Sequence, residues 1–369
     1  MENPWQSDLS ARVDASTTPY ASAARYWGGI AVNVVRANWR AQGAFLLVAA
    51  TIVAARLLLM PSSAGAMLQT LHLSLKPFVA GSALAICGYL FFKTLETRSL
   101  SNSFAYLWSD VFTLRNTVTA IPAFFMVAAT MNCFTMFKSN IPEFRPYELD
   151  VIFAHIDRAL HFGVDPWRIT EYAIGYGSIT KLLDTIYYLW FFAVYISVTV
   201  CIGTPANPEF RHRFLLSFVL IWSILGIACA TALSSAGPIY FDRIYGGPSA
   251  FSTLIKNLTH VTAEYDLTTM IVREALWLDY KTGVEGTISG ISAMPSLHNA
   301  MCVLLVLAAR NVDRGLSIAA AIFALLIFIG SVHLGWHYAI DAYVSLAGVL
   351  VIWKLAGFLT RKPVSIGAV

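Results

Sequence analysis

Long apolar runs constrain the fold of this chain more than any other feature of its sequence. They occupy about 43–60, 77–95, 118–137, 182–203, 214–233, 297–309, 316–335 and 338–358. About 20 apolar residues in a helix cross the hydrocarbon core of a bilayer, and a helix satisfies its own backbone hydrogen bonds there. We therefore predict an all-α, polytopic membrane bundle of about eight transmembrane helices. Because the sixth run is short, we expect it to begin inside the loop at Pro295 or to lie partly within protein.

Composition supports a membrane protein and excludes several other classes. Hydrophobic residues make up 57% of the chain, and charged residues make up 12%, against about 25% in an ordinary soluble domain. The net charge of +4 comes without a basic stripe, so we expect no nucleic-acid partner. Five cysteines, an odd number without paired spacing, lie inside apolar runs. This pattern argues against a disulfide framework or a zinc site.

Lysine and arginine in the short loops predict the orientation in the membrane. Basic residues favour the cytoplasmic side, and they cluster in the polar segment 1–42, at Arg211 and Arg213, and at Arg310 and Arg314. Both termini are then cytoplasmic, and the active site lies on the outer (periplasmic or lumenal) face. The long segments placed on that face are 138–181, 234–296 and 331–341. The predicted parts of the chain are a cytoplasmic segment (1–42), two additional transmembrane helices (43–117) and a six-helix catalytic core (118–369).

Two histidines and an aspartate near the ends of apolar runs are the candidate catalytic residues. His337 and Asp341 are four residues apart, slightly more than one helical turn, so Asp341 can hold Nδ1–H of His337 and leave Nε2 free to attack. His298 lies 39 residues upstream of His337 and can protonate a leaving oxygen from another helix. Polar and ionisable residues within a membrane cost free energy, and those that occur there commonly belong to functional sites. This arrangement suggests phosphoryl transfer through a phosphohistidine at a membrane surface.

At these residues the chain resembles the type 2 phosphatidic acid phosphatase superfamily, which includes lipid phosphotransferases and vanadium haloperoxidases. Its Pro-Ser-Gly-His motif corresponds to Pro295-Ser296-Leu297-His298, and its Ser-Arg-x5-His-x3-Asp motif corresponds to Gly330-Ser331-x5-His337-x3-Asp341. The resemblance covers roughly the last six helices. It implies that His337 is the nucleophile, Asp341 its orienting partner and His298 the general acid.

Two departures from these motifs make the chain more similar to the inositol phosphorylceramide synthase branch. Leu297 replaces the motif glycine, and Ser331 stands where most members have a phosphate-binding arginine. That branch also carries Pro-Ser-Leu-His and His-Tyr-x2-Asp segments, and the segment from Asp157 to Trp167 resembles a loop in its bacterial relatives. The departures leave open whether the acceptor is water or an alcohol.

Candidate phosphate-binding groups are one hydroxyl and three cations. Lys138-x6-Arg145-Pro146 matches the third family motif literally, but in the family that motif closes the helix preceding the Pro-Ser-x-His loop. Here that helix ends near 233, so Arg243 is the better candidate by position, with Lys138 and Arg145 as alternatives. Ser296 can either donate to the phosphate or cap the following helix.

Other patterns have competing interpretations. His333, His337 and Asp341 would share one face of an unbroken helix and could then hold a metal, but Gly335 suggests a turn between two spans. Segment 150–165 fits an amphipathic helix on the outer surface better than a ligand set at Asp157 and His161. Gly283, Gly286 and Gly290 suggest a flexible loop over the site.

The expected function is an integral membrane lipid phosphotransferase without a cofactor. Its partners would be a membrane lipid phosphoester, a polyol or lipid alcohol acceptor, and the bilayer. One alternative is a lipid phosphate phosphatase acting on phosphatidate or polyisoprenyl phosphates. A non-catalytic lipid transporter is the alternative of another class, but a transporter commonly has paired halves with discontinuous helices, and the sequence contains no convincing internal repeat.

Overall fold

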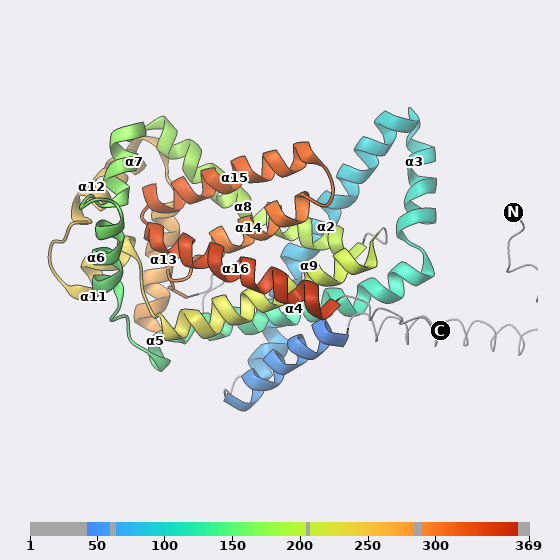
Figure 1. Cartoon of the computed structure of the whole chain (residues 1–369), viewed down its shortest axis with the longest axis horizontal. Helices are drawn as coiled ribbons and strands as arrows, with labels where there is room; N and C mark the ends of the chain where they lie inside the picture. Colours follow the sequence, from blue (N-terminus) through green and yellow to red (C-terminus); the bar gives the residue numbers. More distant parts are fainter. Residues whose placement is uncertain (1–42, 60–63, 204–206, 284–289, 361–369) are drawn as a thin grey trace, which may run out of the picture.

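The computed structural model describes residues 43–59, 64–203, 207–283 and 290–360, and within these ranges the chain is helical and contains no β-strand. The predicted cytoplasmic segment 1–42 lies outside the described residues. Long helices run side by side along the molecule (Figure 1). They are α2 (Ala64–Thr97), α4 (Leu114–Ser139), α8 (Ser178–Gly203), α9 (Pro208–Leu220) with its continuation through the π-helical η3 (Ile221–Cys229) and α10 (Ala230–Ala232), α14 (Leu297–Ala309), α15 (Arg314–His333) and α16 (Ala339–Thr360).

These helices confirm the predicted membrane bundle. Among the described residues, six helices are long and apolar enough to cross a bilayer, and Gly43–Leu59 and α14 are shorter apolar helices. The apolar spans agree with the eight predicted runs to within several residues, whereas the helix α2 begins earlier, at Ala64. At 13 residues, α14 is roughly 20 Å long, shorter than the hydrocarbon core of about 30 Å. It packs against α8, α9, η3, α15 and α16, so protein encloses most of it.

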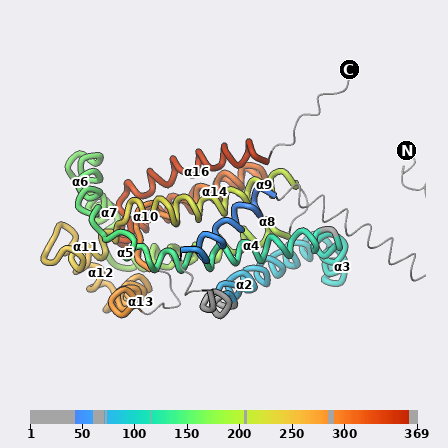
Figure 2. The backbone as a smooth tube through the Cα atoms, turned by 90° about the horizontal axis from the view of Figure 1, so that it is seen from below, coloured from blue at the N-terminus to red at the C-terminus, as the bar shows by residue number. Residues whose placement is uncertain are grey.

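Short helices gather at one end of the bundle (Figures 1 and 2). They are α5 (Ile141–Phe144), α6 (Asp150–Leu160), α7 (Pro166–Ile174), the 3-10 turn η4 (Pro238–Tyr240), α11 (Phe241–Tyr245), α12 (Ser252–Tyr265) and α13 (Thr268–Thr282). The described parts of the long segments 138–181 and 234–296 therefore meet at the same end, and they are largely helical. At the other end of the bundle lie α3 (Leu100–Tyr106) and the π-helical η2 (Leu107–Val111).

A buried carboxylate ties this cluster of short helices to the bundle. Asp184 of α8 is fully buried and accepts hydrogen bonds from the backbone N–H groups of Thr268 and Thr269, each at 2.9 Å. These groups belong to the first turn of α13, where N–H groups have no partner within the helix. Asp184 therefore caps α13 and fixes it over the end of α8.

The helices at the N-terminal side of the described chain are joined to α4 by a buried polar network. Arg56, in the helix Gly43–Leu59, is fully buried, and its Nη1 donates to Oδ1 of Asn132 at 2.9 Å. The amide of Asn132 on α4 donates in turn to Oγ of Ser74 on α2 at 3.1 Å. Buried polar groups are costly unless paired, so this network joins the helix Gly43–Leu59 and α2 to α4.

Candidate active site

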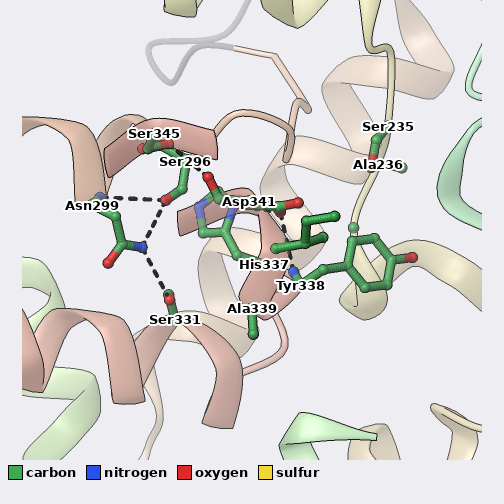
Figure 3. Close-up of polar contacts among 12 residues, drawn as sticks. Ser235, Ala236, Ser296, Asn299, Ser331, His337, Tyr338, Ala339, Asp341 and Ser345 are labelled. Atoms are coloured by element: carbon green, nitrogen blue, oxygen red, sulfur yellow. Dashed lines mark hydrogen bonds and ion pairs between the residues drawn. The ribbon is translucent and has the colours of Figure 1, made fainter. Parts of the chain in front are cut away.

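The segments before α14 and before α16 lie against each other (Figure 3). The N–H of Ser296 donates to the carbonyl of Asp341 at 3.3 Å. The hydroxyl of Ser345 lies 2.8 Å from the carbonyl of Ser296 and 2.7 Å from that of Asp341. These contacts bring together two motifs that are far apart in the sequence, with the start of α14 against the first turns of α16.

His337 and Asp341 form the hydrogen-bonded pair that their spacing predicts. Nδ1 of His337 is 3.1 Å from Oδ2 of Asp341, and the same oxygen accepts from the N–H of Tyr338 at 3.1 Å. His337 is 6% exposed and Asp341 is fully buried. With the carboxylate as acceptor, the imidazole proton lies on Nδ1 and the lone pair lies on Nε2. Asp341 therefore fixes both the tautomer and the orientation of the ring.

The environment of His337 favours the neutral imidazole. Burial, and to a lesser extent the nearby ammonium of Lys138, lowers the pKa of His337 to about 3. Burial disfavours the charged form of a base. A neutral ring has the free nitrogen lone pair that a nucleophile requires.

His298 faces His337 from the first turn of α14. Their ring centroids are 6.0 Å apart. The His298 ring stacks against Tyr187 at a centroid distance of 4.4 Å and lies 4.2 Å from Trp190. Nε2 of His298 is buried and has no hydrogen-bond partner among the described residues. A buried polar atom without a partner costs free energy, and a substrate oxygen would satisfy this one.

Both histidines line one cavity whose wall contains polar and apolar side chains. The cavity volume is about 130 Å³, and Lys138, His298 and His337 are all in its wall. Aromatic side chains of α4, α8 and η3 line much of the remainder: Phe134, Tyr187, Tyr188, Trp190, Phe191 and Trp222. Membrane-spanning helices therefore supply part of the cavity wall. The charged and apolar groups of this wall suit a molecule with a charged head and an apolar tail.

Of the three candidate cations, the structure brings Lys138 to this cavity. Gly290 packs against the end of α4, where a Cβ on Gly290 would lie 2.8 Å from the carbonyl oxygen of Lys138. Because of this contact, the segment between Gly290 and Pro295 begins beside Lys138. Arg243 is absent from the cavity wall; its Nη2 donates to the carboxylate oxygens of Glu274 at 2.8 and 2.9 Å. Arg145 donates to the carbonyl of Ala232 and is also absent from the wall.

Ser296 and Ser331 belong to a buried network that Asn299 holds together (Figure 3). The amide nitrogen of Asn299 donates to Oγ of Ser296 at 3.0 Å and to Oγ of Ser331 at 3.3 Å. Ser296 also caps α14 by accepting from the N–H of Asn299. Both serines are fully buried. Around Ser331, where most superfamily members place an arginine, this chain has a neutral network linking α14 to α15.

His333 lies apart from the catalytic pair. α15 ends at His333, and Gly335 adopts a φ of 74°, so no continuous helix presents His333, His337 and Asp341 on one face. The ring nitrogens of His333 lie 3.0 and 3.1 Å from the hydroxyls of Thr180 and Thr170. Within the described ranges, no group of three or more histidine, cysteine, aspartate or glutamate side chains has a metal-binding arrangement. Of the three glycines predicted to form a flexible loop, Gly283 caps α13, Gly290 packs on α4, and Gly286 lies outside the described residues.

Two further carboxylates support the site without having been singled out as site residues from the sequence. Asp150 accepts from Oγ of Ser235 at 2.7 Å, from the N–H groups of Ala236 and Gly237 at 2.9 and 2.7 Å, and from the hydroxyl of Tyr338 at 3.1 Å. Asp157 accepts from the N–H groups of Ala339 and Ile340 at 3.0 and 2.9 Å. Their spacing of seven residues, about two helical turns, is the signal that would have placed both on one face of α6.

Comparison with known proteins agrees with this geometry. Residues 152–355 match the sequence model of the PAP2 superfamily, which covers more than half of the 369-residue chain and includes both catalytic motifs. This chain belongs to the PAP2 superfamily. Membership supports a phosphatase-type enzyme acting on phosphoesters. Neither the curated proteins nor the solved structures provide a significant match.

Proposed function

We propose that this protein is an integral membrane enzyme that cleaves or transfers the phosphoryl group of a lipid phosphoester through a phosphohistidine at His337. One observation carries the proposal: His337, held neutral and oriented by Asp341, shares a cavity with His298 and Lys138. The aromatic lining of the same cavity fits the apolar part of a lipid.

The proposed reaction has two balanced steps. Nε2 of His337 attacks phosphorus, the bond to the leaving alcohol breaks, and His298, protonated beside the bound phosphate anion, donates that proton to the leaving oxygen. His298, now neutral, takes a proton from the acceptor hydroxyl, which attacks phosphorus and releases His337. Lys138 and the first-turn N–H groups of α14 neutralise the charge that develops on the phosphoryl oxygens.

We further propose that the donor is a phosphodiester and the acceptor an alcohol, as in the inositol phosphorylceramide synthase branch. A phosphomonoester dianion favours capture by a bidentate arginine. The Asn299–Ser331 network is neutral, and Lys138 is the one candidate cation that lies in the cavity wall. A diester carries a single negative charge and needs fewer cations. Release of phosphate to water, as in a lipid phosphate phosphatase, is the alternative.

A donor and acceptor panel tests the proposal. Purified protein in vesicles is incubated with phosphatidate, a polyisoprenyl phosphate or a phosphodiester lipid, each with and without inositol, glycerol or a lipid alcohol. We expect a phosphodiester donor to be consumed and its phosphoryl headgroup to appear on the added alcohol. Rapid release of inorganic phosphate from monoesters, unaffected by alcohols, would contradict the transferase function and support the phosphatase function. Failure to cleave any of these phosphoesters would contradict both proposed functions.

We also propose that the site lies on the outer face of the membrane. Arg310 and Arg314 are exposed and lie at the end of α14 and the start of α15, opposite the end that carries the catalytic residues. A short basic loop favours the cytoplasm. Labelling a cysteine introduced at exposed Lys256 with a membrane-impermeant reagent in intact cells or spheroplasts tests this orientation, and labelling only after permeabilisation would contradict it.

A further inference from the structure

The helix α6 has an inverted distribution of polar and apolar residues. Its buried face carries Asp150, Phe153 and Asp157, whereas Ile152, Ile156 and Leu160 form an exposed row at spacings of four residues. A helix on the surface of a soluble protein places its apolar stripe toward the core. Here the two acids lie with Phe153 on the buried face, whereas the apolar row and His155 are exposed.

The exposed row continues onto a turn that projects an aromatic ring. Phe162 follows α6, has a φ of 58° and is 99% exposed. Its neighbour Val164 is 42% exposed. A phenylalanine held outside the fold in a left-handed conformation gains nothing from packing within this chain. The apolar surface of α6 thus extends to its C-terminal turn.

The bilayer is the partner that fits this surface. α6 crosses the end of the bundle instead of running along it (Figures 1 and 2), and it packs against α16. Nε2 of His161 lies 3.0 Å from the hydroxyl of Tyr343 on α16. From Tyr343, exposed residues continue along this membrane span to Leu346 and Leu350. The apolar row of α6 therefore lies on a helix packed against a membrane span with exposed apolar residues.

Cationic groups flank the row where lipid headgroups would lie. Arg158 and Arg168 are 42% and 48% exposed at their side chains. Both also contact the buried carboxylate of Asp165, which fixes the turn between α6 and α7. Interfacial helices combine an embedded apolar face with cations at headgroup level.

The inward face of α6 accepts hydrogen bonds from the segments that carry the candidate catalytic residues. Asp157 accepts from the first N–H groups of α16, and Asp150 binds both the Ser235–Gly237 segment and the hydroxyl of Tyr338, the residue after His337. Gly237 in turn lies so close to the chain before His337 that a Cβ would be 2.6 Å from the carbonyl oxygen of Trp336. Movement of α6 would therefore displace the backbone that carries His337 and Asp341.

We propose that α6 is an interfacial helix, with the Ile152–Ile156–Leu160 row and Phe162 embedded in the adjacent leaflet, and that this anchoring positions the catalytic pair through Asp150 and Asp157. The catalytic half of this proposal rests on the proposed function. The membrane contact and its mechanical coupling do not, because both are measured without turnover.

Depth-dependent quenching tests the membrane contact. An environment-sensitive dye is attached to Phe162→Cys, in a full-length protein whose exposed Cys87 is replaced by serine, in phosphatidylcholine vesicles. Lys256→Cys on α12 is the polar, exposed control. We expect nitroxides on lipid acyl chains to quench the Phe162 position about threefold more than the control, and aqueous iodide to show the reverse order. Equal quenching of both positions by iodide, with none by lipid nitroxide, would overturn the proposal.

Amide hydrogen exchange in the same vesicles tests the coupling. Phe162→Asp and Ile156→Asp place a charge on the embedded face, and Leu278→Asp places one on an exposed position of α13. We expect the N–H groups of Ala339 and Ile340 to exchange about tenfold faster in the first two variants and at the wild-type rate in the third. Wild-type protection in all three variants would overturn the coupling. A protein that shows lipid quenching and coupled exchange but cleaves no phosphoester would contradict the proposed function alone.

Discussion

His298 and His337 border the same cavity with their ring centroids 6.0 Å apart. A reacting group between them would be near both the attacking nitrogen and the proton donor. Attack requires contacts of about 3 to 3.5 Å between the reacting atoms, and proton transfer requires about 2.6 to 3.2 Å. The spacing of the two rings is therefore of the size that one phosphoryl group requires.

Replacement of the nucleophile should abolish turnover. We expect His337→Ala to reduce kcat by about a thousandfold or more, and Asp341→Asn by about a hundredfold, because the amide cannot stabilise an imidazolium. Initial rates in detergent, with thermal unfolding as a check of the fold, measure both. His260→Ala removes an exposed histidine of α12 and should retain wild-type kcat. A folded His337→Ala protein with full activity would contradict the mechanism.

Separate substitutions of Lys138 and Arg243 should show which of the two cations binds the phosphate. Lys138 lies in the cavity wall, and Arg243 was the better candidate by sequence position. Loss of a charge-stabilising donor commonly reduces the rate by about a hundredfold, and we expect this for kcat/KM of Lys138→Met. Arg243→Met breaks the pair with Glu274 outside the cavity wall and should change kcat/KM by less than about threefold. The reverse order of the two effects would assign the phosphate to Arg243.

Activity should persist in excess EDTA. Charge neutralisation by Lys138 and a helix N-terminus requires no divalent ion, and the ring nitrogens of His333 contact threonine hydroxyls on α7 and α8. Initial rates before and after chelation measure this. Complete loss of activity that zinc or magnesium restores would show that the reaction depends on a metal.

Removal of the Asp150 carboxylate should destabilise the fold. Asp150→Ala leaves the buried N–H groups of Ala236 and Gly237 without their acceptor, and we expect a loss of about 3 kcal/mol or more. The melting temperature in detergent measures the loss. Glu264→Gln alters an exposed acid of α12 and serves as the control. Equal melting temperatures for Asp150→Ala and wild type would show that the network contributes no stability.

Acid should destabilise the protein in part through His337. Its pKa of about 3 in the folded protein is below the roughly 6.5 of an unfolded histidine. The unfolded state therefore takes up the proton first, and stability that is intact above about pH 6.5 decreases as the pH falls toward about 3. We expect the melting temperature of His337→Gln to fall less than that of wild type between about pH 7 and about pH 4.5. Parallel declines would contradict the assigned pKa.

Sequence patterns predict much of the fold because they act over short distances. Apolar runs place the spans to within several residues, and the four-residue spacing of His337 and Asp341 predicts their hydrogen bond. Which of the three candidate cations lies at the cavity depends on a tertiary contact that the spacing of residues along the sequence does not predict. Gly290 meets the end of α4, more than 150 positions earlier in the chain, and this contact brings Lys138 rather than Arg243 to the cavity.

The sequence alone determined the membrane bundle, the two motifs that contain His298, His337 and Asp341, and the superfamily they resemble, since hydrophobic periodicity and local spacing are properties of contiguous residues. Tertiary structure decided what surrounds the motifs. The stacking of His298 on Tyr187, the network of Asn299 and the grip of Asp150 and Asp157 on the catalytic segments all join different helices. Such contacts follow from how the helices pack, and the buried polar groups that make them have no partner until the bundle has assembled.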